Sequence, residues 1–151
     1  MSVQSRKVVR EEVGQFLSTR LTTASQVYTD QPSDFGGQSP VVVVTSSGSD
    51  REGLNKRTFG GPIAATFRLD VYVFVATTKK NSVGEDVPNS DADDQLDTLE
   101  ASIAQFVSDA PSAQTWTALS YGAGTETTFV EVLDGAEYKR ERIPLTITGK
   151  G

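Results

Sequence analysis

The sequence of 151 residues contains no cysteine and no histidine. The lack of cysteine excludes disulfides, thiolate nucleophiles and thiolate metal ligands. The lack of histidine removes the side chain most often used as a general base at neutral pH and as a transition-metal ligand. We therefore expect a protein that is not an enzyme, with no catalytic residue, no cofactor and no bound metal.

Long apolar runs are also missing. The longest one, Pro40 to Val44, is far shorter than the ~18 apolar residues typical of a membrane span. The opening residues MSVQSRK lack the apolar segment of a secretory signal. Apolar residues make up only 36% of the chain, and the polar surplus gathers in stretches rich in Gly, Ser, Asp and Asn. We expect a soluble protein with one domain over residues 1–151, one core and long polar loops.

Positive charge is absent from a long stretch of the chain. Between Lys80 and Lys139 there is no Lys or Arg, whereas twelve acids fall there. The flanking segments hold all fourteen basic residues and eight acids, so they sum to +6 and the middle to −12. This distribution predicts an acidic side and a mildly basic side on each molecule.

Two segments predict amphipathic helices. Over residues 6–22 the apolar residues recur at steps of three and four, which places polar residues such as Arg10 and Glu12 mostly on the wet side. Gly14 indicates close packing on this helix, because glycine there costs ~1 kcal/mol relative to alanine. The second helix follows Ser90, which we expect to cap it with Asp93 at the third position, and Pro111 ends it.

Several segments predict strands. Residues 63–77 alternate so completely that only a long strand explains them, with Tyr72 and Phe74 on the second face. The other expected strands cover residues 26–30, 41–45, 116–121, 127–133 and 137–148. Asp134-Gly135 predicts a hairpin turn between the last two, and Pro144 predicts an edge position or a bulge. Residues 46–62 and 78–90 are predicted loops. The fold class is α+β, an antiparallel or mixed sheet with both helices packed on one face.

Three groups of residues allow both a functional and a simpler interpretation. The acidic pairs Asp93-Asp94 and Glu85-Asp86 are typical of a cation site or of a solvated helix start, and capping together with the helix dipole favours the helix start. The expected loop contains Arg51, Lys56, Arg57 and Phe59, which suit nucleic acid or a protein partner. Interleaved acids favour the protein partner. Tyr72 and Phe74 are expected either beneath a helix or in a contact between subunits.

The order of these elements resembles the tail-terminator (minor tail protein, head-tail joining) family of long-tailed bacteriophages. The matching segments are the N-terminal amphipathic helix, Pro40 to Val44 followed by a long polar loop, the strand from Phe67 to Val75, the acid-capped helix containing LDTLE, and the closing hairpin ending in IPLTI. The likeness covers nearly the whole chain, but it is a pattern of elements without a signature motif.

The resemblance implies a virion protein of the tail and neck, assembled in the host cytoplasm. Such proteins form a ring, a hexamer, that caps the tail tube, stops its polymerisation and offers a surface to the head connector. We also predict that the loop with Arg51, Lys56, Arg57 and Phe59 becomes ordered when it docks to its partner. An acidic segment with Asp91, Asp93, Asp94 and Asp97 facing the channel would repel DNA phosphates and let the genome pass without specific binding; ordinary solubility is the alternative explanation. Another head- or tail-completion protein of the neck, or a small-ligand binding module, is the alternative function.

Overall fold

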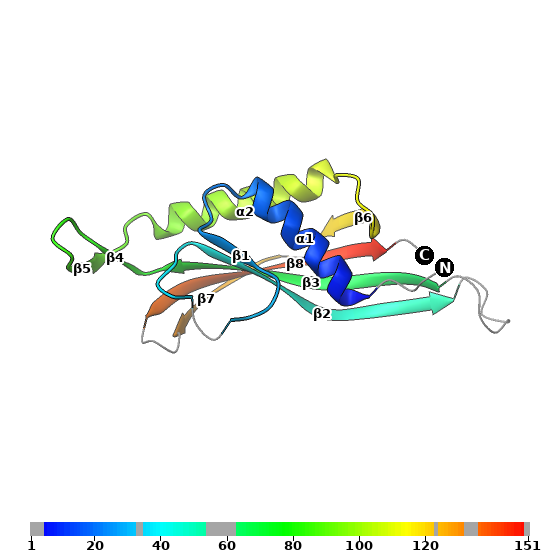
Figure 1. The fold of residues 1–151 in the computed structure, drawn as a ribbon, viewed down its shortest axis with the longest axis horizontal. Helices are drawn as coiled ribbons and strands as arrows, with labels where there is room; N and C mark the ends of the chain where they lie inside the picture. Colours follow the sequence, from blue (N-terminus) through cyan, green and yellow to red (C-terminus); the bar gives the residue numbers. More distant parts are fainter. Residues whose placement is uncertain (1–4, 33–34, 54–62, 123, 132–135, 150–151) are drawn as a thin grey trace.

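The computed structural model describes residues 5–32, 35–53, 63–122, 124–131 and 136–149 (Figure 1). Within them the elements follow in this order: α1 (Arg6–Arg20), β1 (Gln26–Tyr28), β2 (Val41–Gly53), β3 (Ile63–Ala76), β4 (Thr78–Lys80), β5 (Asp86–Pro88), α2 (Ala92–Asp109), β6 (Trp116–Tyr121), β7 (Glu126–Glu131) and β8 (Glu137–Gly149). The predicted α+β class is confirmed. Among the described residues no helix combines the length and apolarity needed to cross a membrane.

The main sheet is mixed. Its strands lie in the order β1-β2-β3-β8-β6, and β7 pairs with β8 beside β6. β1 runs parallel to β2, whereas the other pairs are antiparallel. β8 is therefore a central strand, with β3 along one edge and β6 and β7 sharing the other.

Both helices cover the same face of this sheet (Figure 1), as predicted. The apolar residues of α1 and α2 form one core with the alternate residues of β3 from Ala65 to Val75. Ser5 caps α1, because its Oγ accepts a hydrogen bond from the Val8 amide at 3.1 Å. This core accounts for the apolar periodicity of the two helical segments.

The opposite face of the sheet, here called the helix-free face, has a smaller core. Phe74 is buried there by Phe35, from the segment between β1 and β2, and by Tyr138 of β8, with ring centroids 4.8 and 6.4 Å away. Tyr72 lies on the same face, with the Arg140 guanidinium 5.0 Å from its ring centre. The alternative that placed these aromatic residues beneath a helix is therefore wrong.

Gly14 has the packing role that its position predicts. A Cβ built on Gly14 would lie 2.3 Å from Cγ2 of Thr29, well inside the contact distance of two carbon atoms. α1 therefore approaches the end of β1 closely at this point. The propensity cost of glycine is offset by the packing that it allows.

The two expected loops are partly strands. β2 continues to Gly53 because the long β3 offers partners as far as Ile63, so backbone pairing outweighs the weak strand propensity of its Ser and Gly residues. Residues 78–90 contain the separate hairpin β4–β5. The turn predicted at Asp134-Gly135 lies outside the described residues.

Pro144 lies neither at an edge nor at a bulge of the β3–β8 pairing, contrary to prediction. It faces Asp70 of β3, and its carbonyl oxygen accepts a hydrogen bond from the Gly122 amide at 2.7 Å on the other side. The N and C=O of one strand residue point to the same side, so the missing N–H is directed away from β3. On that side β8 pairs with β7 as far as Arg142 and with β6 from Leu145 onwards. Pro144 therefore lies where neither strand is paired with β8.

The start of α2 also differs from the expectation. Its N-cap is Asp91, without a side-chain cap, and the Asn89 side chain accepts a hydrogen bond from the Asp91 amide at 3.2 Å. Asn89 also donates to the carbonyl of Ala76 at 2.9 Å and to Gln95 at 3.1 Å. Asn89, rather than Ser90, therefore fixes the entry to the helix.

Candidate interaction surfaces

The residues predicted to contact a partner lie at one end of the sheet. Arg51 belongs to β2, where its backbone pairs with Ala65, whereas Lys56, Arg57 and Phe59 lie outside the described residues. Sequence reasoning placed Arg51 in a loop, which is wrong. Because three of these four residues lie outside the described residues, whether their side chains form one site stays a prediction.

This end of the sheet is a two-stranded projection. The pairing of β3 with β8 stops at Thr66, but β2 and β3 continue through three more pairs, Arg51↔Ala65, Glu52↔Ala64 and Gly53↔Ile63. Figure 1 shows β2 and β3 reaching beyond β8. We call residues 51–53 and 63–65 the β2–β3 extension. Because β1 pairs only with residues 41–43, the described part of β2 beyond Val43 has an outer edge without a strand partner.

The four predicted channel-facing acids gather at the start of α2, but two of them are paired with lysines. Lys79 lies 3.6 Å from Asp91, and Lys139 of β8 contacts Asp93. Asp94 and Asp97 are exposed and form no ion pair with described residues. The helix dipole stabilises acids in this first turn, so their presence does not require a ligand.

The acidic segment and the basic flanking segments are less separated in the fold than their positions in the sequence predict. Cations from the flanking segments fold back onto the acidic segment in five ion pairs: Arg20–Asp109, Lys79–Asp91, Lys80–Asp86, Lys139–Asp93 and Arg142–Glu126. The sequence could not show this, because three of these pairs join residues that are far apart in the chain. The fold thus partly neutralises the acidic side.

A buried acidic group lies between α2 and the sheet. Glu141 of β8 is 8% exposed, and burial raises the pKa of its carboxyl, assisted by the charges of Glu100 and Asp97. Tyr121 of β6 donates a 2.5 Å hydrogen bond to Glu100, and burial followed by this bond raises the pKa of Tyr121. Burial and the neighbouring acids therefore disfavour the ionised form of Glu141. No three acids among the described residues are placed to hold a metal ion.

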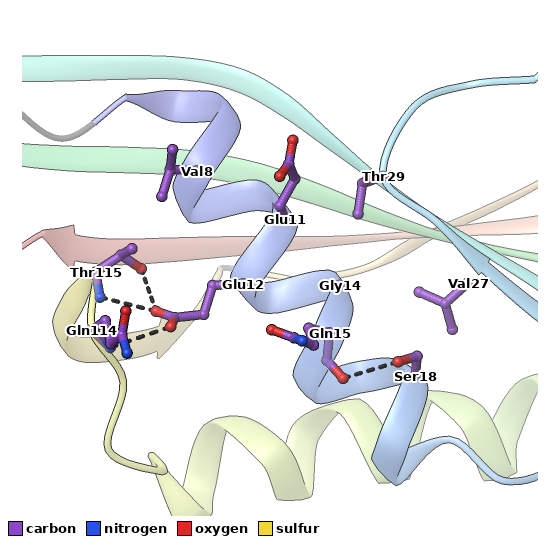
Figure 2. Close-up of a pocket in the computed structure, with 10 residues that line it drawn as sticks. All are labelled: Val8, Glu11, Glu12, Gly14, Gln15, Ser18, Val27, Thr29, Gln114 and Thr115. Atoms are coloured by element: carbon purple, nitrogen blue, oxygen red, sulfur yellow. Dashed lines mark hydrogen bonds between the residues drawn. The ribbon is translucent and has the colours of Figure 1, made fainter.

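An open depression lies along the outer side of α1 (Figure 2). Its volume is about 570 Å³, and its walls come from Val27 of β1, Thr29 just after it, and the connection between α2 and β6 (Gln114 and Thr115). From the helix it is lined by Val8, Glu11, Glu12, Gly14, Gln15 and Ser18. Such a polar and open hollow suits a protein segment better than a small apolar ligand, which binds in a more enclosed cavity.

Two charged residues of α1 hold the helix against these walls. Glu12 accepts hydrogen bonds from Thr115 N (2.9 Å), Thr115 Oγ1 (2.6 Å) and Gln114 N (3.3 Å), as Figure 2 shows. On the other flank Arg10 donates to the Thr29 carbonyl at 2.6 Å and to Ser46 Oγ at 2.9 Å. The helical periodicity placed both side chains mostly in water, and it carried no signal of these distant partners.

The hairpin β4–β5 protrudes at one end of the molecule (Figure 1). Its tip carries Val83, which is 72% exposed, whereas the next most exposed large apolar residue of the described chain is Val8, at 48%. Sequence reasoning assigned no role to this segment. In the sequence, the exposed tip was indicated only by a single valine within a polar, glycine-containing stretch.

A comparison with models of known protein families finds no match to this chain, and a comparison with curated proteins finds no significant similarity.

Proposed function

We propose that the chain is a structural subunit of the tail-terminator type, which assembles as a ring on the end of a phage tail tube. In this role it stops tube polymerisation and offers a surface to the head connector, while DNA passes through the ring. Two features support this role: the order of the elements, which resembles that family, and a mixed sheet with both helices on one side.

The β2–β3 extension is the observation that carries the proposal. A partner can add a strand to an edge whose backbone N–H and C=O groups are unpaired. Among the described residues no strand pair joins the extension to β8 or to β1, while the rest of the same strands is fixed in the main sheet. An end of this kind presents backbone groups for docking at little conformational cost, because the strands are already ordered.

The chemistry near this end fits a protein partner. Arg51 lies in the extension, and Lys56, Arg57 and Phe59 follow it in the sequence. Arginine and aromatic residues are enriched in the centres of protein interfaces. The exposed acids Asp94 and Asp97, which form no ion pair with described residues, suit a surface past which DNA slides, since carboxylates repel phosphates.

Mass photometry of the purified chain, alone and with purified tail tubes, tests the ring. We expect a particle of six copies in at least one of these conditions. A chain that stays monomeric in both would refute the proposal.

Negative-stain electron microscopy of particles made without the protein tests the terminator role. We expect tails of abnormal length, because nothing would stop the tube from growing. Tails of normal length would instead indicate a head- or tail-completion subunit. Replacing Arg51, Lys56, Arg57 and Phe59 together with serine should give the same abnormal tails, with circular dichroism showing that the fold is kept; normal tails would exclude this segment as the docking site.

A further inference from the structure

Arg140 of β8 holds a buried polar atom that has no hydrogen-bond partner among the described residues. Its Nε is enclosed by the protein, yet no described acceptor receives the hydrogen. Buried donors without an acceptor are rare, and they cost more stability when the group is charged. The arrangement of Arg140 therefore serves the isolated fold poorly.

Most cations that the structure describes have an acid beside them: Lys7, Arg10, Arg20, Arg68, Lys79, Lys80, Lys139 and Arg142. Arg6 also has no ion pair with a described acid, but it is exposed at the start of α1, where water solvates its charge. Arg140 differs from both groups because it is half-buried and still has no described acid beside it. It is the spare cation of the sheet.

Tyr72 holds the Arg140 side chain against the sheet. The guanidinium lies 5.0 Å from the ring centre. The two residues come from neighbouring strands, in which Arg140 faces Phe74 and Tyr72 faces Arg142. A cation over an aromatic ring is fixed in position without being neutralised. The guanidinium is therefore preorganised, and a ligand would lose little free energy in ordering it.

The site is open on the helix-free face. Both helices lie on the opposite side of the sheet (Figure 1). Arg140 stands beside Phe74 and two residues from Tyr138, at the rim of the smaller aromatic core. A protein that packs on this face would bury the aromatic rim and meet the guanidinium at the same point.

The charges near Arg140 suit a single carboxylate better than a row of phosphates. Arg142, on the same face, is already 3.2 Å from Asp70 and 3.9 Å from Glu126. The face thus offers one spare positive charge with acids close by. DNA contacts several phosphates at once and needs several free cations. A guanidinium, in contrast, binds one carboxylate through two N–H groups.

We propose that Arg140, positioned by Tyr72, is a binding site for one carboxylate of a protein partner that packs on the helix-free face. The acidic side chain neutralises the spare cation, and the surface around it covers the aromatic rim. The site is separate from the β2–β3 extension, and the inference does not depend on a ring.

Amide NMR of the isotope-labelled chain tests the site with small probes. The peptide acetyl-GEG-amide should shift the signals of Tyr72 and its neighbours with a Kd in the millimolar range, as expected of one charge-assisted pair. The uncharged peptide acetyl-GQG-amide should leave them in place. Arg140→Met should abolish the shifts, whereas Arg68→Met, which removes a paired cation from the same face, should keep them. Tyr72→Phe should bind like the wild type, and Tyr72→Leu about 2- to 5-fold more weakly.

Three outcomes would overturn the proposal. The first is a wild-type chain that does not respond to acetyl-GEG-amide, and the second is an equal response to both peptides. The third is a stronger shift of the same signals by a short DNA duplex, which would assign the site to phosphate.

Thermal unfolding adds a measurement that a purely structural arginine would move in the opposite direction. Arg140→Met keeps an apolar stem and removes a desolvated charge, so the Tm should stay the same or rise. Arg142→Met, on the same strand and face, should lower the Tm because the buried Asp70 loses its cation. An equal fall in Tm for the two variants would show that Arg140 serves the fold, and would contradict the proposal.

These tests use the chain without any partner, so they separate this site from the proposed function. Peptide binding by a chain that never forms rings would leave the site standing and overturn the ring. A ring-forming chain that does not bind the peptide would do the reverse.

Discussion

Glu12→Ala is expected to destabilise the protein through the loss of three hydrogen bonds in the wall of the depression. Glu12 is the acceptor for two backbone amides and for the Thr115 hydroxyl, and Thr115 is only 4% exposed. Hydrogen bonds to a charged group contribute about 1.5–3 kcal/mol, and buried donors left without an acceptor add to the loss. We expect the free energy of unfolding to fall by about 2–3 kcal/mol, and the Tm by about 5–10 °C for a chain of this size.

Glu11→Ala is the matched control in the same helical turn. Glu11 is half exposed and makes only the 3.8 Å contact with Lys7, so its loss should cost less than about 0.5 kcal/mol. Urea and thermal unfolding, followed by circular dichroism, measure both variants. Thr115→Val in the Glu12→Ala background should recover part of the stability, because it removes a buried hydroxyl that has lost its acceptor. Equal losses for Glu12→Ala and Glu11→Ala would refute this account of how α1 is held.

Substitutions at three further sites, two of them with a partner or control variant, test other parts of the fold. Gly14→Ala should destabilise by about 1–2 kcal/mol in urea unfolding despite its better helix propensity, and Thr29→Ser should reverse the loss by removing the methyl group in the way. Asn89→Ala should cost about 2 kcal/mol in the same assay through three hydrogen bonds, whereas Ser90→Ala should change stability by less than about 0.5 kcal/mol. Glu141→Gln should stabilise the protein at pH 7. A carboxyl whose pKa is raised on folding binds its proton more tightly in the folded state, so wild-type stability should gain as the pH falls towards about 4.5, and the variant should lack that gain. A stability difference between wild type and Glu141→Gln that does not change with pH would contradict the raised pKa.

Local patterns predicted the elements whose stability depends on a buried face. The spacing of apolar residues gave both helices, and the strict alternation of 63–77 gave the long β3 with its core residues on one face. Gly14 is the clearest case, because its propensity cost within a helix predicted the close approach that the structure shows. These features depend on residues a few positions apart, so sequence reasoning could find them.

Features that depend on distant partners were missed. The polar half of β2 is a strand because β3 lies alongside it, and no property of Ser46 to Gly53 indicates that partner. Pro144 lies in a central strand because β6 and β7 leave an interval beside it, which only the topology reveals. The roles of Arg10 and Glu12 likewise depend on partners 19 to 103 residues away.

The central place of β8 has a consequence for how the protein folds. β8 aligns Tyr138 with Ala76 and Thr148 with Thr66, so the sheet cannot close until segments distant in the chain have met. Closing such long loops is entropically costly, and proteins dominated by contacts of this kind fold in milliseconds to seconds rather than microseconds. During that interval the valine-rich start of β2 is without its neighbours. Newly made chains are therefore exposed to aggregation, and a chaperone or a low rate of synthesis should raise the yield of native protein.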